Sequence, residues 1–298
     1  MARAMRILPN YGSALARIFS PIVMDSLIDS GYSRYLNDAL LSTGILKQVD
    51  TSMRLGKFLD VMYSLIAESH RSEYIYKNAI ANKILLGKYS LNTACMLTEF
   101  RVGKCKADVV ILNRTSTTYE IKSEFDSFDR VAGQVESYTQ VFDLVNVITS
   151  HSQLAKLESL LPREVGLMEL TDAYTIRTAR EPISMKRHVK PKVIFDALRK
   201  PEHLRIIKKV YGYVPDVPNT RMYAECRNLF SKLAPELAHD EMVRVLSQRP
   251  DRKALAQLID EIPSSLNAYV LSAALSRAQA TRLKELMRVS LGAILLPL

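Results

Sequence analysis

Two carboxylates and an ammonium are spaced so that they could act together on one reacting group. Asp108 lies in a short β-branched run at 107–112, and Glu120 and Lys122 lie in a second run at 118–122. The polar residues 113–117 predict a turn, so the two runs are expected to pair as a β-hairpin. Successive side chains of a strand alternate between its faces, which puts Glu120 and Lys122 on one face. Asp108 is expected to lie across the hairpin from them.

Such a set of side chains is typical of metal-assisted hydrolysis. Carboxylate oxygens are the ligands that Mg²⁺ prefers, and a nearby Lys can orient a water and neutralise charge that develops on a phosphate. A lone Glu-x-Lys tripeptide on a strand more often marks a solvated strand face. The interpretation as a site therefore depends on the residues that follow the hairpin.

Residues 129–143 predict an amphipathic helix. The stretch contains no Pro, and its apolar residues recur at helical spacing, namely Val131, Val135, Tyr138 and Phe142. Arg130, Gln134 and Tyr138 are four residues apart and form a polar stripe beside the apolar one. Guanidinium, amide and phenol donors suit contact with a phosphodiester backbone. Residues 145–149 then predict a further strand.

These residues resemble the PD-(D/E)xK nuclease superfamily, whose core is a hairpin carrying Asp and then Glu-x-Lys, followed by a helix. Asp108, the tripeptide at 120–122 and the Q-x-x-x-Y pair Gln134 and Tyr138 match that pattern in order. The Pro of the family motif is absent, and Ala107 stands in its place.

The wider stretch, roughly 73–205, is similar to a bacterial branch of uncharacterised, predicted nucleases. The resemblance implies an α/β fold with a restriction-endonuclease-like mixed sheet flanked by helices. It also implies a nuclease that depends on Mg²⁺ or Mn²⁺ and hydrolyses phosphodiester bonds, with DNA as the favoured substrate. A role in phage defence or on a mobile element is what the resemblance suggests.

The resemblance also assigns roles to single residues. Asp108, Glu120 and the backbone carbonyl of Ile121 would hold the metal, and Lys122 would position the attacking water. Asp108, Glu120 and Lys122 are thus the expected catalytic residues. The expected substrate-binding residues are Gln134, Tyr138 and Arg130.

An additional carboxylate is expected from outside the hairpin motif, because many superfamily members take one from a helix that precedes the sheet. Glu73 and Glu99 are the two candidates, and the sequence does not decide between them. The simpler interpretation of Glu73 is an ion pair with Lys77, one helical turn away.

The chain is long enough for more than one domain. It has 298 residues, of which 48% are hydrophobic and 24% charged, as in soluble globular proteins. Three regions are predicted: a helical N-terminal region at 1–55, a nuclease-like core at 56–180 and a basic helical domain at 181–298. The last holds 20 Lys and Arg against 12 Asp and Glu, so most of the net charge of +10 lies there. Such a region suits contact with DNA or a partner protein.

The remaining composition excludes several classes of protein. Cys95, Cys105 and Cys226 show neither metal-ligand spacing nor a disulfide framework, so no zinc site is expected and a cytoplasmic location is predicted. The N-terminal stretch 1–19 is interrupted at positions 9, 10 and 12, which predicts no signal peptide. No stretch approaches the roughly 18 apolar residues of a membrane span.

Two other functions remain open. A non-catalytic module could keep the nuclease fold and bind nucleic acid or protein, although two carboxylates facing a polyanion argue against it because like charges repel. An RNA-directed nuclease effector would share the site and differ only in substrate, because that choice depends on groove shape and 2′-OH contacts.

Overall fold

The computed structural model describes residues 11–295 and divides the chain into two compact units. The first unit joins the residues up to Gly87 with 172–175 and with the residues from Arg252 onward. The second consists of 88–171 and 176–251. Residues 1–10, which hold part of the stretch considered for a signal peptide, and 296–298 lie outside the described residues.

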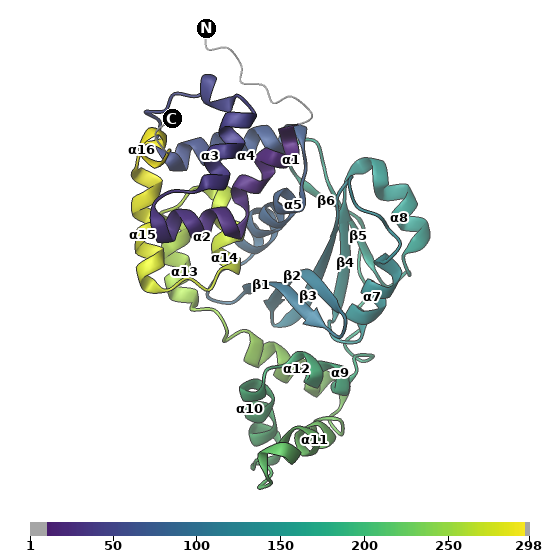
Figure 1. The fold of residues 1–298 in the computed structure, drawn as a ribbon. Coiled ribbons are helices and arrows are strands. Elements are labelled where there is room, and N and C mark those ends of the chain that lie inside the picture. Colours follow the sequence, from purple (N-terminus) through teal and green to yellow (C-terminus); the bar gives the residue numbers. More distant parts are fainter. Residues whose placement is uncertain (1–10, 296–298) are drawn as a thin grey trace. The chain divides into compact units, whose positions relative to one another are not determined.

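The second unit is built on a six-stranded mixed sheet in which the strands lie side by side in chain order (Figure 1). They are β1 (Cys95–Val102), β2 (Cys105–Asn113), β3 (Thr115–Lys122), β4 (Leu144–Thr149), β5 (Gly166–Leu170) and β6 (Ile176–Arg180). β1, β2 and β3 are antiparallel, β3, β4 and β5 are parallel, and β6 is antiparallel to β5. The predicted mixed α/β class and the predicted hairpin are confirmed.

The turn of the hairpin is shorter than the sequence predicts. Asn113 pairs with Thr115, so Arg114 alone turns the chain, with a left-handed φ of 61°. The predicted turn at 113–117 is therefore wrong over most of its length. The hydroxyl residues Ser116 and Thr118 continue the strand because their side chains are buried and hydrogen-bonded, Ser116 to His239 and Thr118 to the Val109 carbonyl.

Helices on the second unit share a core with the sheet. They are α7 (Val131–Thr139), α8 (Leu154–Leu160), α9 (Pro191–Ala197), α10 (Lys200–Tyr211), α11 (Asn219–Phe230) and α12 (Pro235–Leu246). α7 packs against β2 and β4, α9 against β1, and α12 against β2 and β3. Val110, Val135, Phe195 and Met242 belong to one buried cluster.

The first unit is helical. Its helices are α1 (Gly12–Ala16), α2 (Pro21–Ser30), α3 (Arg34–Ser42), α4 (Leu55–Ser69), α5 (Glu73–Ala79), α13 (Arg252–Ile259), α14 (Asn267–Ser272), α15 (Arg277–Arg288) and α16 (Leu291–Ile294). A π-helical segment, Ile80–Leu85, continues α5 into the short α6 (Leu86–Lys88).

Buried polar contacts join the N-terminal and C-terminal segments that make up this unit. Asn78 of α5 donates to the Ser264 carbonyl at 3.0 Å and accepts from the Ala268 N–H at 2.8 Å. α15 packs against α2 and α4. None of the helices in the described range 11–295 is long and apolar enough to cross a membrane.

The compact units cut across the three consecutive regions expected from the sequence. The region 181–298, expected as one basic helical domain, contributes residues up to 251 to the unit that holds the sheet and the rest to the helical unit. The region 56–180 is likewise shared, because α4 and α5 belong to the helical unit. The sequence pattern predicts single helices and strands. It does not specify the long-range contacts that group them into units.

Asp143, between α7 and β4, holds a buried polar junction of the second unit. Its carboxylate accepts from the Thr115 hydroxyl at 2.5 Å, from the Ser184 hydroxyl and from the Lys186 N–H at 3.1 Å. Burial acts to raise the pKa of Asp143, but these hydrogen bonds hold it below its usual value. The ionised form is therefore stabilised in the folded protein.

We expect Asp143→Ala to lower the free energy of unfolding by about 2 kcal/mol at pH 7, because three partly buried hydrogen bonds lose their acceptor. A lowered folded pKa gives stability that is present above the unfolded pKa and lost as the pH falls through the folded pKa. The difference from wild type should therefore shrink in acid. Urea unfolding at several pH values measures it, with the exposed Asp216→Ala as control. An equal loss in both variants would contradict the assignment.

Candidate active site

Three acidic residues stand at one level across β1, β2 and β3. Thr98 pairs with Val109 and Phe100 with Ala107, which sets Glu99 of β1 beside Asp108 of β2. Val109 pairs with Tyr119, which sets Asp108 at the level of Glu120 on β3. The predicted position of Asp108 across the hairpin is confirmed by the Ile121 N–H, which donates to Asp108 Oδ2 at 2.7 Å.

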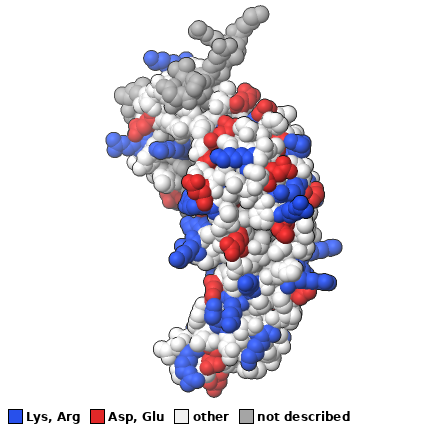
Figure 2. Space-filling model, turned by 90° about the vertical axis from the view of Figure 1, so that its right-hand side faces the viewer, with Lys and Arg blue, Asp and Glu red and all other residues white. Residues whose placement is uncertain are grey.

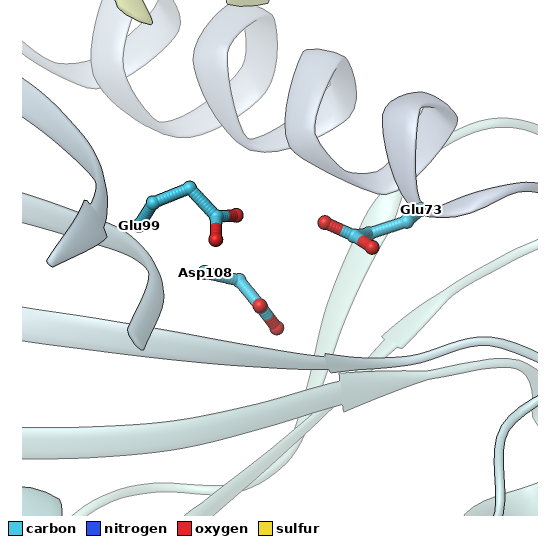
Figure 3. Close-up of side chains that lie close together, drawn as sticks. All are labelled: Glu73, Glu99 and Asp108. Carbon is cyan, nitrogen blue, oxygen red and sulfur yellow. The ribbon is translucent and has the colours of Figure 1, made fainter. Parts of the chain in front are cut away.

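Glu99 and Asp108 bring their carboxyl groups together. An oxygen of each lies within 4.8 Å of the other, and Figure 3 shows the two groups turned toward the same region beside the strands. Glu99 has a left-handed φ of 52°, which a residue with a Cβ seldom adopts. Backbone strain of this kind is concentrated at functional sites. Lys106 lies 3.9 Å from the Glu99 carboxylate.

Glu120 and Lys122 form a buried ion pair. Lys122 Nζ donates to Glu120 Oε1 at 2.8 Å. The Lys122 side chain is only 7% exposed and that of Glu120 only 2%. A solvated strand face, the common meaning of a Glu-x-Lys tripeptide, does not describe this pair. Both side chains lie on the same face of β3, as the alternation of the strand predicts.

Helix α7 supplies the other partners of this ion pair. Gln134 Oε1 accepts from Lys122 Nζ at 2.9 Å. The Tyr138 hydroxyl lies 2.9 Å from Glu120 Oε2 and 2.7 Å from the Lys106 carbonyl oxygen, and its single proton can be donated to only one of them at a time. The predicted Q-x-x-x-Y pair therefore contacts the Glu-x-Lys tripeptide directly.

Burial controls the protonation of this network. It raises the pKa of Glu120 above its usual value, while the charge and hydrogen bond of Lys122 act in the opposite direction. Burial also raises the pKa of Tyr138, and the charges of Glu120 and Asp108 add to the rise. Tyr138 is thus held in its neutral, hydrogen-donating form.

The acidic pair fits the donor set of a hard divalent cation. Mg²⁺ binds oxygen at about 2.0–2.1 Å, so two ligand oxygens on opposite sides of one ion are about 4.2 Å apart. The Glu99 and Asp108 oxygens, within 4.8 Å of one another, need only a small movement to meet that spacing. Each carboxylate oxygen of Glu120 also keeps a lone pair beyond the one used by Lys122 or Tyr138.

The structure places the other predicted site residues as follows. Ile121 lies in β3 with its N–H on Asp108, and Arg130 is the exposed residue before α7. Glu73 opens α5 in the helical unit, where its carboxylate pairs with Lys77 at 2.5 Å, as the one-turn spacing predicts. Glu73 remains a predicted additional ligand.

Sequence reasoning missed the turn that follows Lys122. Asp126 Oδ2 accepts from both the N–H and the hydroxyl of Ser123, at 2.8 Å and 2.6 Å. The signal was present, because Ser and Asp three residues apart are typical of a tight polar turn. This turn fixes how the chain leaves the end of β3.

Much of the predicted basic surface is already paired with acids. Lys209 lies 2.5 Å from Glu241, and Arg249 lies 2.7 Å from Glu202. On the face drawn in Figure 2, basic and acidic side chains are interspersed. Net charge therefore supports a polyanionic partner only weakly.

We expect Tyr138→Phe to lower the free energy of unfolding by about 1 kcal/mol, because the hydrogen bond from the hydroxyl to Glu120 or to the Lys106 carbonyl is lost. The phenyl ring still fills the same space in the core. Urea denaturation measures the loss. Tyr213→Phe, at a tyrosine that is 54% exposed, is the control and should leave stability unchanged. A neutral Tyr138→Phe would show that the hydroxyl does not hold Glu120.

Comparison with known proteins assigns the chain to a protein family. A family model described as Bacteriophage P4 protein cII matches residues 67–271, a span that includes every predicted site residue. Protein cII of Enterobacteria phage P4 is 29% identical over 87 residues, which are 28% of this chain and 33% of that protein. The aligned part thus spans about a third of the length of that relative. No solved structure matches the chain significantly. Since the family model covers more than half of its length, the chain belongs to the bacteriophage P4 protein cII family.

Proposed function

We propose that this protein is a metal-dependent nuclease of the PD-(D/E)xK type, with a restriction-endonuclease-like core, that hydrolyses phosphodiester bonds in nucleic acid. DNA is the favoured substrate. The observation that carries the proposal is the buried Glu120–Lys122 pair, which is held from α7 by Gln134 and Tyr138 at the level of the Glu99 and Asp108 carboxyl groups.

Lys122 is positioned to act on a phosphate. Its ammonium has three N–H bonds and, among residues 11–295, donates two of them, to Glu120 and Gln134. The third is left for the attacking water or a phosphate oxygen. Because the partners are fixed by β3 and α7, the charge is oriented before substrate arrives, which is what electrostatic stabilisation of a transition state requires.

The chemistry is a single displacement at phosphorus. A water oxygen gives up a proton to solvent and forms the new bond to phosphorus, the bond to the leaving oxygen breaks, and the leaving oxygen takes up a proton from solvent. Lys122 neutralises charge that builds on the phosphate. Asp108, Glu120 and the Ile121 carbonyl, with Glu99 or Glu73, would hold Mg²⁺ or Mn²⁺. When bound, the ion would polarise the phosphate and make the water more acidic.

The relation to a phage protein supports a role on a mobile element or in phage defence. Gln134 and Tyr138 are engaged with Lys122 and Glu120, so they act on substrate through those residues. Arg130, exposed at the start of α7, is proposed to contact the phosphodiester backbone directly.

Purified protein is incubated with supercoiled plasmid, linear DNA, single-stranded DNA and structured RNA, each with Mg²⁺, Mn²⁺ or EDTA. Metal-dependent cleavage of DNA is the expected result. Cleavage of RNA alone would make the protein an RNA-directed nuclease. Binding of nucleic acid without cleavage under every condition would favour the non-catalytic module and overturn the proposal.

A further inference from the structure

Resting on the proposed nuclease function, we propose that Arg177 binds a second phosphate of the nucleic-acid backbone, a few nucleotides away from the phosphate that is cut. Glu169 is the positioning residue, because its buried carboxylate holds the Arg177 guanidinium. Both residues lie with Lys122 in the second compact unit.

Strand register places Arg177 on the same face of the sheet as Lys122. Lys122 of β3 pairs with Thr149 of β4, which pairs in turn with Glu169 of β5. Glu169 pairs with Arg177 of β6. Paired residues of neighbouring strands point to the same face, so these four side chains form one row across the sheet. The row follows the carboxyl ends of the parallel strands β3, β4 and β5, which is where open α/β sheets bind their ligands.

The Glu169 carboxylate is buried and is held through both of its oxygens. Its side chain is only 6% exposed. Oε2 accepts from Arg177 Nε at 2.8 Å and from Arg177 Nη2, and Oε1 lies 3.1 Å from His151 Nδ1. Because each oxygen has its own partner, the carboxylate cannot rotate without losing a contact. The plane of the guanidinium is therefore set before any ligand binds.

The guanidinium reaches solvent from this buried anchor. The Arg177 side chain is 55% exposed, and within residues 11–295 its guanidinium donates from Nε and Nη2 to Glu169, so both N–H bonds of Nη1 are left for a ligand. Burial of a carboxylate is unfavourable, and an ion pair with a half-exposed arginine adds little stability. A fixed donor for an anion is therefore a better explanation of this arrangement than stability. Guanidinium geometry matches that of phosphate.

The separation of Arg177 from Lys122 suits two phosphates of one strand. Neighbouring β-strands lie about 4.8 Å apart, so the steps from β3 through β4 and β5 to β6 separate the two Cα atoms by about 14 Å. Side chains stand roughly perpendicular to a sheet, so the two cationic groups stay apart and contact different phosphates. One strand of a duplex rises about 3.4 Å per nucleotide, which makes this distance about four nucleotides, and fewer in an extended single strand.

Methylphosphonate scanning tests this contact. Oligonucleotides that carry one uncharged methylphosphonate at successive positions are bound in Ca²⁺, and affinity is measured by anisotropy for wild type and Arg177→Gln. Arg177→Gln should bind the unmodified strand about tenfold more weakly, as expected for loss of a charged hydrogen bond. At one position away from the cut, the methylphosphonate should weaken wild-type binding by about the same factor and leave binding by Arg177→Gln unchanged.

Glu169→Gln tests the positioning role. The substitution raises the net charge by one, so a purely electrostatic effect would tighten binding. We expect weaker binding of the unmodified strand and loss of the methylphosphonate effect at the Arg177 position, because the guanidinium is no longer held. Tighter binding with that effect retained would overturn the role of Glu169. Arg288→Gln is the matched control, at an arginine whose side chain is 70% exposed and pairs with a carboxylate, and it should retain the wild-type profile.

The outcomes separate this inference from the nuclease proposal. Metal-dependent cleavage by wild type, with a methylphosphonate profile that Arg177→Gln leaves unchanged at every position, would overturn the inference and leave the nuclease proposal standing. Coupling of Arg177 to one phosphate in a protein that binds but never cuts would support the contact and overturn the nuclease proposal. Failure of wild type to bind any nucleic acid would overturn both.

Discussion

Lys122→Ala should reduce the rate of phosphodiester hydrolysis by about 10³-fold, the loss typical of removing one preorganised charged donor from a transition state. Affinity for Mn²⁺, measured by calorimetry, should be retained because none of the proposed ligands Asp108, Glu120 and Glu99 is replaced, and a bound cation supplies Glu120 with a counter-charge in place of Lys122. Single-turnover kinetics with saturating substrate separates the loss of chemistry from weaker binding. A Lys122→Ala variant with near wild-type rates would remove Lys122 from the mechanism.

Lys122→Ala also removes the counter-charge of buried Glu120, and breaking a buried pair is destabilising. Without Lys122 the pKa of Glu120 should rise further, since Lys122 acts to lower it. A raised folded pKa gives stability that is present below the unfolded pKa and lost as the pH rises through the folded pKa. The variant should therefore lose stability relative to wild type as the pH rises.

A second variant separates the structural role of the Glu120–Lys122 pair from its catalytic role. Lys122→Met combined with Glu120→Gln removes both buried charges and keeps the side-chain volumes, so stability should recover toward that of wild type. The rate of hydrolysis should stay at least about 10³-fold below that of wild type. Recovery of hydrolysis in this double variant would show that the pair matters only for folding.

Asp108→Asn should weaken Mn²⁺ binding by about 100-fold, because the number of charged ligands largely sets the affinity of an oxygen site. The amide oxygen can still accept from the Ile121 N–H, so the hairpin should keep its shape. Isothermal titration of wild type and variant measures the change. Unchanged Mn²⁺ affinity would exclude Asp108 as a ligand.

Asp129→Asn is the matched control, because the Asp129 carboxylate is exposed. Within residues 11–295 it accepts only one hydrogen bond, from the hydroxyl of nearby Ser127. It should leave Mn²⁺ affinity unchanged. Glu99→Gln and Glu73→Gln, titrated in the same way, decide which acid completes the site. The left-handed backbone of Glu99, and its place in the same compact unit as Asp108, favour Glu99.

The local part of the site could be predicted from the sequence. Strand alternation places Glu120 and Lys122 on one face, and helical spacing places Gln134 and Tyr138 on one stripe. Both relations depend only on the period of one element. The structure agrees with each of them, since the side chains meet as one hydrogen-bonded group.

The error in the hairpin turn has a physical cause. Ser116 and Thr118 are polar, and in a single sequence such residues indicate a loop. In the folded protein both hydroxyls are buried and satisfied by His239 and by the Val109 carbonyl. His239 is far along the chain, so nothing near the turn could reveal this partner.

What the sequence by itself determined is therefore the set of local elements and the residues that each presents on one face. Only the tertiary structure decided that Glu99 stands beside Asp108, because the register of β1 on β2 depends on pairing between strands. It also decided that Glu120 and Lys122 are buried, because the cover comes from α7. Finally, it divided the C-terminal helices between two units, because a helix's apolar face does not specify which core it joins.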